Sequence, residues 1–313
     1  MHRNATGLIA VDWGTSSFRA YRLGAEGKVL DQVKCAAGIS SVTPGGFDAL
    51  LFEKIGHWIG SGTPEPILMS GMIGSRQGWV EAPYIDAPAS IDDVARRLVR
   101  VPHARSTNTF IVPGLVMKSG PMPDVMRGEE TQIFGALQQR EQAHGTFVLP
   151  GTHSKWAQVE DGAIRRFETY MTGDVFAAIR GHTILGALMS DSTDLHIDGF
   201  RRGLEAGNRA GSPGALLHRM FGARTHALFG EIDADAVSDY LSGLLIGAEF
   251  AEAAPRSGGV VQIIGASDLA DRYLLAAEWA GLSADRIDPD CAAAGLHAIA
   301  VRAALLEPVG EKH

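Results

Sequence analysis

Residues 8–17 read LIAVDWGTSS, an apolar run that ends in an aspartate and a turn of glycine and hydroxyl residues. The run from Leu8 to Val11 predicts a short buried strand. The stretch FVLPGTHSK at 147–155 repeats the arrangement. Each turn is followed by an alternating segment, a glycine-containing hairpin and a second alternating segment, within residues 18–33 and 155–171. The chain therefore predicts a duplicated unit of strand, turn, strand, hairpin and strand.

The composition of both turns suits a bound phosphate. Glycine lets the backbone approach closely, successive N–H groups form an anion-binding concavity, and threonine and serine add hydroxyl donors. A single turn of this kind occurs often by chance, whereas two in matching context favour a nucleotide clamp. No partner spacing suggests that the histidine of the second turn binds a metal, so it is a phosphate donor candidate only. The candidate nucleotide-binding residues are Gly14, Thr15, Ser16 and Ser17, then Gly151, Thr152, His153, Ser154 and Lys155.

Asp12 supplies a charge that the hydroxyl groups lack. A carboxylate beside phosphates repels them unless a cation lies between, and Mg²⁺ is commonly held by one or two carboxylates together with phosphate oxygens. Pro150 stands near the second turn where the first has Asp12. We therefore expect one metal-binding carboxylate, Asp12, and one Mg²⁺ ion.

Length and charge narrow the class of protein. The 313 residues are enough for two domains of ordinary size, and prolines near position 120 suggest a boundary close to 125, giving domains 1–125 and 126–313. A net charge of −8 offers no broad attraction to nucleic acid or an acidic membrane. Two cysteines are too few for a disulfide framework, and no apolar run is long enough for a signal peptide or a membrane span. We expect a cytoplasmic enzyme.

The segment MSGMIGSRQGWVEAPY at 69–84 is too polar for an ordinary core segment and resembles a substrate loop. Arg76 is its main candidate, because a planar guanidinium can hold a substrate carboxylate through two hydrogen bonds. Trp79 is a candidate wall of the same pocket. The alternative for Arg76 is a solvated arginine on a surface loop.

A helix is predicted to begin near Glu129, with Ile133, Phe134 and Leu137 on its buried side. Adjacent carboxylates at a helix start are more often solvated complements of the helix dipole than catalytic groups. Here they lie where two domains must meet. Glu129 and Glu130 are about 100° apart around the helix axis, so only one can face a cleft. We favour Glu129 slightly.

Farther along, Asp174 stands near the start of another helix, where it either caps that helix or lines the substrate cleft. A helix at 235–254 is assigned to the core through Val237, Leu241, Leu244, Leu245 and Ala248. A strand at 260–264 leads to Gly265, Ala266 and Ser267, which open a helix to Trp279 with Ser267 as N-cap and leave room for a flat purine. A last helix covers residues 291–306 and can pack back on the first domain.

These segments together resemble the sugar-kinase branch of the actin, Hsp70 and hexokinase superfamily, and more closely the 2-dehydro-3-deoxygalactonokinases. DWGTSSFRAYRL and LPGTHSKW resemble the two phosphate motifs, SGMIGSRQGWVEAPY and DVMRGEETQIFGAL the inner segments, and IIGASDLADRYLLAAEWAG the adenosine-side segment, from about residue 7 to 306. The resemblance implies an α/β protein of two ribonuclease H-like domains, of the actin-like ATPase type, with an interdomain active-site cleft. It also adds Arg19 to the nucleotide-binding candidates and Ser70, Gly71, Met72, Thr172 and Asp174 to the substrate-binding ones.

The resemblance further implies transfer of the γ-phosphoryl group of ATP to the 6-hydroxyl of 2-keto-3-deoxygalactonate. The expected partners are ATP, Mg²⁺ and the sugar acid, with a homodimer as a possible assembly. Related sugar kinases place an Asp base near the start of the crossing helix, whereas this chain has Glu129 and Glu130 there.

In the expected mechanism Asp12 orients Mg²⁺, the two turns clamp the phosphates, Glu129 or Glu130 accepts the hydroxyl proton, and Lys155 adds positive charge. Three alternatives stay open: another sugar kinase of the superfamily, a non-catalytic nucleotide-gated sugar sensor, and a phosphohydrolase.

Overall fold

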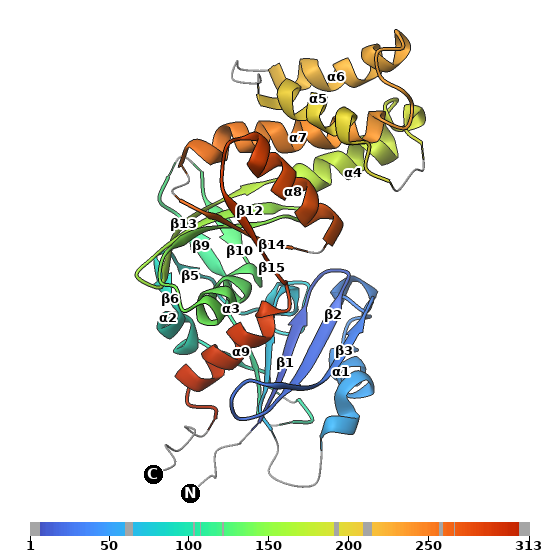
Figure 1. Cartoon of the computed structure of the whole chain (residues 1–313). Coiled ribbons are helices and arrows are strands. Elements are labelled where there is room, and N and C mark those ends of the chain that lie inside the picture. Colours follow the sequence, from blue (N-terminus) through green and yellow to red (C-terminus); the bar gives the residue numbers. More distant parts are fainter. Residues whose placement is uncertain are drawn as a thin grey trace, which may run out of the picture. The chain divides into compact units, whose positions relative to one another are not determined.

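The computed structural model describes nine stretches of the chain (Figure 1). They are residues 7–59, 65–102, 104–106, 108–120, 122–190, 194–208, 215–256, 259–265 and 267–306. The chain forms two compact units, which we call the first and the second unit. The first unit comprises Met1–His144, Val159–Phe167 and Pro289–His313, and the second comprises Gly145–Gln158 and Glu168–Asp288.

A six-stranded sheet organises the first unit, in the order β3-β2-β1-β4-β8-β7. Strands β1, β2 and β3 form an antiparallel meander, whereas β4 and β8 continue the sheet parallel to β1. The meander confirms the strands predicted around the first turn. The strands are β1 (Leu8–Trp13), β2 (Phe18–Leu23), β3 (Val29–Cys35), β4 (Ile67–Ser70), β7 (Val99–Arg100) and β8 (Thr109–Ile111).

Strand β1 is buried along its whole length, so its two faces pack against different elements. Ile9, Val11 and Trp13 lie in a core with helix α1 (Phe47–Ile55), where Trp13 meets Phe47 edge to face at 5.8 Å. Because side chains alternate along a strand, Asp12 points to the opposite face. Helix α9 (Cys291–Arg302) packs against β1 as well.

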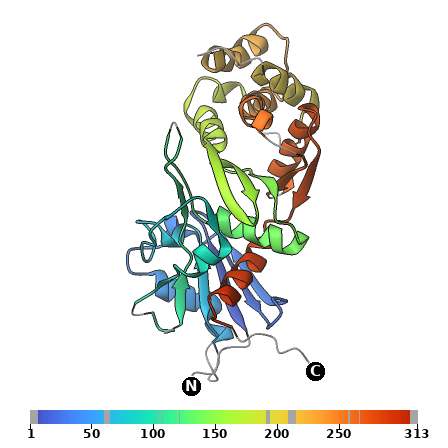
Figure 2. The ribbon, with the colours of Figure 1, turned by 90° about the vertical axis from the view of Figure 1, so that its left-hand side faces the viewer.

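Helix α3 (Glu129–Arg140) confirms the helix predicted at Glu129, and its Ile133, Phe134 and Leu137 are buried. It lies beside α9, as Figure 1 and Figure 2 show. A Cβ atom on Gly135 would lie 1.9 Å from the Cys291 carbonyl oxygen, so glycine is required at this crossing. Helix α9 ends at Arg302, four residues earlier than predicted, because the chain leaves helical geometry at Ala303 and Ala304.

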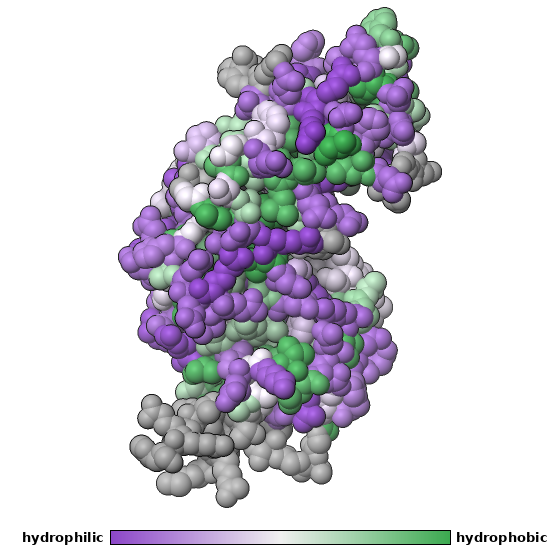
Figure 3. Space-filling model, viewed as in Figure 1, coloured by the Kyte–Doolittle hydropathy of each residue, from purple (hydrophilic) through white to green (hydrophobic). Residues whose placement is uncertain are grey.

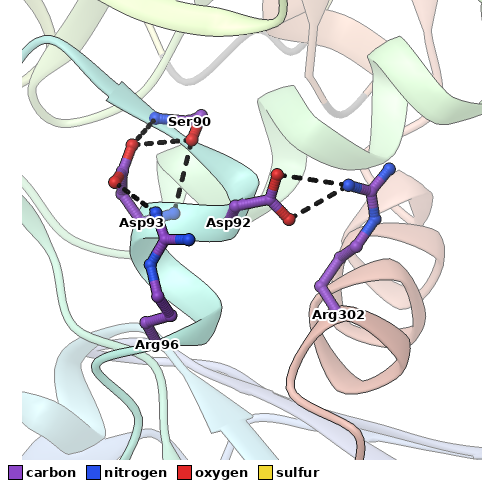
Figure 4. A network of polar contacts seen from close by, with 5 residues as sticks. All are labelled: Ser90, Asp92, Asp93, Arg96 and Arg302. Carbon is purple, nitrogen blue, oxygen red and sulfur yellow. Dashed lines mark hydrogen bonds and ion pairs between the residues drawn. The ribbon is translucent and has the colours of Figure 1, made fainter.

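The first unit also contains a three-stranded sheet, β10-β9-β5, and helix α2 (Ile91–Ala95). Helix α2 begins with a capping box in which Ser90 and Asp93 exchange hydrogen bonds, and Asp92 receives Arg302 of α9 at 3.0 Å (Figure 4). The strands of this sheet are β5 (Ile85–Asp86), β9 (Leu115–Met117) and β10 (Asp124–Met126).

The second unit repeats the topology of the first. Its sheet has the order β15-β14-β11-β12-β13-β6, with β14 parallel to β11 and to β15. The series β13-β12-β11-β14-β15 therefore corresponds to β3-β2-β1-β4-β8, which confirms the predicted duplication. The strands of this sheet are β11 (Gly145–Leu149), β12 (Ser154–Glu160), β13 (Ala163–Tyr170), β14 (Val261–Ile264) and β15 (Ala284–Ile287), together with β6 (Ala89–Ser90), which belongs to the first unit. Residues 159–167 of the β12–β13 hairpin count with the first unit, where β13 pairs with β6.

Helices α5 and α7 of the second unit touch almost backbone to backbone, because Gly203 and Gly243 face each other at their crossing. Helix α7 confirms the helix predicted at 235–254. Four of its predicted core residues are buried, but Ala248 is only half-buried. The helices are α4 (Thr172–His182), α5 (Ile197–Asn208), α6 (Ala215–Leu228), α7 (Val237–Ala253) and α8 (Ser267–Trp279). Short 3₁₀ helices cover Ile39–Ser41, Gly56–Trp58, Met72–Gly74, Gly186–Leu188 and Ala254–Arg256.

The surface seen in Figure 3 is largely hydrophilic, with apolar residues in scattered groups. Among the helices that the structure describes, none combines the length and the apolar character needed to cross a membrane.

Candidate active site

Asp12 lies at the carboxyl end of β1, beside Ser70 at the end of the parallel strand β4. Ligands of open α/β sheets bind beyond these strand ends. Asp12 is 7% exposed. Its Oδ2 lies 2.7 Å from Nη2 of Arg19, the residue opposite Asp12 on the neighbouring strand β2. Burial raises the pKa of Asp12, and the Arg19 charge opposes that shift. The structure thus brings together Asp12, Arg19 and Ser70 from three separate predictions.

Two glycines with left-handed backbone angles bring the start of α3 to the same place. Gly71 has φ +90°, and a Cβ atom there would lie 3.3 Å from Asp12 Oδ1. Gly128 has φ +107°, and a Cβ atom there would lie 3.1 Å from Gly71 Cα. Neither position tolerates a side chain, so the backbone of the α3 start, the end of β4 and Asp12 are held in close approach.

Glu130 and Glu129 at the start of α3 have different surroundings. Glu130 is fully buried, and it accepts hydrogen bonds from the Gly128 N–H at 2.7 Å and the Thr131 hydroxyl at 3.1 Å. Burial and the neighbouring Glu129 charge raise the pKa of Glu130 to about 8. Glu129 is half-buried and accepts from the Arg127 N–H at 2.9 Å. Of these two carboxylates, only Glu129 is exposed enough to contact a ligand.

Several buried polar atoms in this region lack a directed hydrogen bond within the described ranges. They are Asp12 Oδ2, whose contact is the Arg19 ion pair, Arg19 Nε, Ser70 Oγ, Ser75 Oγ and two nitrogens of Arg127. Unsatisfied buried polar groups cost free energy and point to a missing partner. The described residues contain no cluster of three His, Cys, Asp or Glu side chains that could enclose a metal. Asp12 therefore fits a cation that takes most of its ligands from phosphates and water.

The first turn presents its tip outward. The Gly14 N–H donates to the Ser17 carbonyl at 2.9 Å and closes the turn. The Ser40 N–H and the Ser40 hydroxyl both donate hydrogen bonds to the Thr15 carbonyl. Thr15 and Ser16 remain exposed. The backbone of the turn is thus fixed while its tip is available to a ligand.

The second turn is fixed by the start of α4. The Asp174 N–H donates to the Thr152 carbonyl at 2.9 Å, and Asp174 Oδ2 lies 2.9 Å from Nε2 of His153. The suggestion that Asp174 caps α4 is wrong, because Met171 is the N-cap residue and Asp174 lies within the first turn. Thr152 and His153 are exposed, whereas Lys155 is buried and donates to the Thr169 hydroxyl at 2.9 Å.

Behind this turn lies a carboxylate that the sequence did not single out. Glu249 of α7 is 3% exposed and accepts hydrogen bonds from four side chains. The donors are Ser154, Trp156 and Tyr273, each at 2.7 Å, and Thr172. The hydroxyl groups of two predicted ligand-binding residues, Ser154 and Thr172, are therefore directed at Glu249.

A pocket of about 330 Å³ opens beside the second turn, among α4, α7 and α8. Its wall includes Gly151, Thr172 and Tyr273, together with an ion pair of 2.6 Å between Arg272 and Asp239. Gly265 lies against Pro150 and Ala270 and is not part of this wall. The predictions for Ala266 and for the Ser267 side chain lie outside the described residues.

The segment 69–84 differs from the prediction in one respect. Ile73 is fully buried and Trp79 packs against the core of the first unit, so the segment contributes to the core that it was expected to avoid. The surrounding glycines and polar residues gave no sign that Ile73 is buried. Its burial results from the 3₁₀ turn at Met72–Gly74, which turns the side chain inward. Met72 is half-buried, and Arg76 is 86% exposed and paired with Glu81 at 3.0 Å.

Arg127 is a further residue that the sequence did not single out. Its side chain stacks on the Tyr84 ring at 4.2 Å and donates to the Ala82 carbonyl at 2.8 Å. Its Nη1 lies 3.0 Å from the position that a Cβ atom on Gly74 would take. It directly precedes Gly128 in the motif RGEETQ, and this charged residue beside a predicted helix start was the available signal.

Comparison with known proteins agrees with this geometry. The profile of the 2-keto-3-deoxy-galactonokinase family matches residues 12–299. A probable 2-dehydro-3-deoxygalactonokinase of Rhizobium meliloti (strain 1021) is 39% identical over 302 residues, covering 93% of this chain and 95% of its own. The 2-dehydro-3-deoxygalactonokinase of Escherichia coli (strain K12) is 33% identical over 295 residues, covering 93% and 97%.

Solved structures show the same relationship. A crystal structure from Sinorhizobium meliloti, described as a candidate 2-dehydro-3-deoxygalactonokinase, has a TM-score of 0.86 and 36% identity and covers 94% of this chain and 98% of its own. The activator of the 2-hydroxyisocaproyl-CoA dehydratase from Clostridium difficile, solved with bound ADPNP, has a TM-score of 0.51 at 12% identity, covers 95% of both chains and shows the fold alone. The fold is thus the two-domain, actin-like ATPase type that was predicted. The chain belongs to the 2-keto-3-deoxy-galactonokinase family, a family of kinases.

Proposed function

We propose that this kinase transfers the γ-phosphoryl group of ATP to the 6-hydroxyl of 2-dehydro-3-deoxy-D-galactonate, giving the 6-phosphate in galactonate breakdown. The observation that carries the proposal is the meeting of Asp12, the Gly71 and Gly128 backbone and the α3 carboxylates at the ends of β1 and β4. Family membership supplies the substrate class, because both curated relatives bear the name of that activity.

Asp12 is the proposed Mg²⁺ residue. Its carboxylate is buried at the end of β1, and its Oδ2 already pairs with Arg19 Nη2 at 2.7 Å, so a bound cation would share the carboxylate with Arg19 or displace it. When bound with ATP, Mg²⁺ neutralises charge on the phosphate oxygens. Asp12 would hold the ion, and the exposed tips of the two turns would donate N–H and hydroxyl hydrogen bonds to phosphate. Lys155 is buried at the base of the second turn, where it would add positive charge.

Glu129 is the proposed acceptor of the hydroxyl proton. A base must come within hydrogen-bonding distance of the group that it deprotonates, and the half-buried Glu129 meets that requirement better than the enclosed Glu130. Glu130, with a pKa of about 8, is mostly protonated at pH 7 and therefore a poor base there. Its hydrogen bond from the Gly128 N–H would fix the start of α3.

We assign the nucleotide to the second unit. The pocket beside Gly151 has a volume suited to a nucleoside, and a purine stacked on its apolar wall would place its phosphates toward the second turn. On this proposal the first unit carries the sugar-acid and metal groups together with the α3 carboxylates, and the second unit carries the nucleotide site.

The carboxylate of the sugar acid has two candidate partners. Arg76 is exposed and can exchange its Glu81 ion pair for a substrate. Arg127 is the second candidate, because its Nε and Nη1 are buried without a hydrogen-bond acceptor in the described part of the chain. Ser70, Gly71, Met72 and Trp79 would line the sugar, whereas Thr172 lines the pocket that we assign to the nucleotide. The 6-hydroxyl is consumed in the six-membered ring, so the reacting form must be the open chain or the five-membered ring.

We further propose a cytoplasmic enzyme, since its two free cysteines suit a reducing compartment, and a homodimer as its assembly. Neither nucleic acid nor a membrane has a part in the proposal.

The test is ADP release from Mg-ATP with 2-keto-3-deoxygalactonate, with its gluconate epimer, and without sugar. Turnover that requires the galactonate compound is expected. ADP release without sugar would instead identify a phosphohydrolase. Silence in all three would favour a non-catalytic sensor or a sugar kinase with a different acceptor.

A further inference from the structure

Glu249 accepts hydrogen bonds from four side chains on three different elements. Ser154 and Trp156 lie on β12, Thr172 begins α4, and Tyr273 lies on α8. An ionised carboxylate offers about four lone-pair sites, so these donors satisfy it completely. A fully buried carboxylate with this many partners fixes the relative positions of all the elements that reach it.

The elements joined by Glu249 are those that enclose the proposed nucleotide. Thr172 and Tyr273 line the pocket, and Ser154 directly follows the exposed tip of the second turn. The backbone supports the same arrangement, because a Cβ atom on Gly173 would lie 2.4 Å from the Gly151 carbonyl oxygen. Glu249 itself does not line the pocket. Its influence on a ligand must therefore act through the residues that it holds.

We propose that Glu249 is a positioning residue for the nucleotide, which holds the second turn, the start of α4 and the α8 wall of the pocket in their binding arrangement. The inference rests on the proposed function, since it assumes that the nucleotide occupies the second unit. It separates the substrates: Glu249 sets the affinity for Mg-ATP and leaves the affinity for the sugar acid unchanged.

Glu249→Gln is the direct test, because the amide keeps the shape of the side chain but turns one acceptor into a donor that faces two other donors. The KM for Mg-ATP should rise about tenfold or more, while the KM for the sugar acid stays within about twofold. Calorimetry with Mg-ADP should show the same loss of affinity. A folded variant with an unchanged KM for Mg-ATP would overturn the proposal.

Trp156→Phe is the second variant, in case Glu249→Gln does not fold. Trp156 donates to Glu249 from outside the pocket, so its loss leaves the nucleotide contacts intact. A rise of severalfold in the KM for Mg-ATP is expected, and no rise would contradict the positioning role.

Leu241→Ala is the matched control for lost stability. Leu241 is fully buried on the same helix, α7, and does not itself line the pocket, although it shares a core with the wall residue Leu245. An equal rise in its KM for Mg-ATP would mean that general loosening of α7 explains the effect, and the proposal would fail. If the unaltered enzyme did not bind Mg-ADP at all, the nucleotide assignment itself would be wrong, and the inference with it.

Discussion

The two turns stand on the same scaffold, yet they carry their negative charge in different places. Strand β1 ends in Asp12, whose carboxylate lies at the strand end beside Arg19. Strand β11 is followed by Pro150 instead of an acidic residue. The buried carboxylate near the second turn is Glu249, which lies behind the turn and accepts hydrogen bonds from four side chains. Duplication preserved the strand order, whereas the chemistry of the two turns diverged. A carboxylate at the strand end can bind a cation, whereas a carboxylate behind the turn binds only side chains of the protein itself.

Removing the strand-end carboxylate should have the largest effect. Asp12→Ala should lower kcat on the order of a thousandfold, because phosphoryl transfer depends on neutralised phosphate charge. Pro150→Ala, next to Leu149, which matches Asp12 when the two Gly-Thr turns are aligned, should leave kcat within about threefold. Steady-state kinetics at saturating Mg-ATP would measure both, and near-normal turnover in Asp12→Ala would refute the assignment of Mg²⁺ to this residue.

Glu129 and Glu130 at the start of α3 allow a second comparison, between a partly exposed carboxylate and a buried one. Glu129→Gln should lower kcat about a hundredfold, the usual contribution of a general base. Glu130→Gln should lower it less, since the new amide keeps an oxygen that can accept the Gly128 N–H. The pH dependence of kcat should lose its acid limb only in Glu129→Gln. If Glu130→Gln were the more damaging change, the base would be reassigned to Glu130.

Arg76 and Arg127 of the first unit allow a comparison between an exposed cation and a buried one. Arg76→Ala should raise the KM for the sugar acid about tenfold with little change in kcat, because the lost interaction is present in ground and transition states alike. Arg127→Ala should destabilise the fold through the lost stack on Tyr84 and the lost hydrogen bond to Ala82. A sugar-acid KM that rises only in folded Arg127→Ala would transfer the carboxylate-binding role to Arg127.

The smallest effect concerns stability and pH. Glu130 has a pKa of about 8 in the folded chain, against an ordinary value of 4.5. Between these values the folded state keeps a proton that the unfolded state releases, so stability falls as pH rises from about 5 to 8. Relative to Glu130→Gln, the unaltered protein should lose roughly 1–3 kcal/mol over this window. Thermal unfolding at pH 5, 7 and 8.5 would measure it, and a pH-independent difference would show that Glu130 does not titrate there.

Local patterns were enough to predict the strands around both turns, strand β14 and the start of α3, whereas the short strands between residues 67 and 126 were not assigned. Alternation, glycine hairpins and helix starts depend on neighbours in sequence, and the residues around Asp12 and Gly151 carried those signals. Glu249 escaped prediction because its partner Ser154 is 95 positions away, so nothing near Glu249 marks it. Arg127 stands beside the predicted start of α3, but its partner Ala82 lies 45 positions earlier, so the motif did not reveal what the side chain contacts. Long-range hydrogen bonds of this kind become visible only once the fold is assembled.

The close crossing of α9 on α3 has a consequence for the order in which the protein folds during synthesis. Most of the first unit precedes the second unit in sequence, but its sheet is covered by helix α9, which is synthesised after the whole of the second unit. Asp290, just before α9, also receives the Tyr21 hydroxyl of β2 at 2.8 Å and the Lys34 ammonium of β3. The second unit needs no residue beyond Asp288. The half of the molecule that is synthesised first is therefore the half that is completed last.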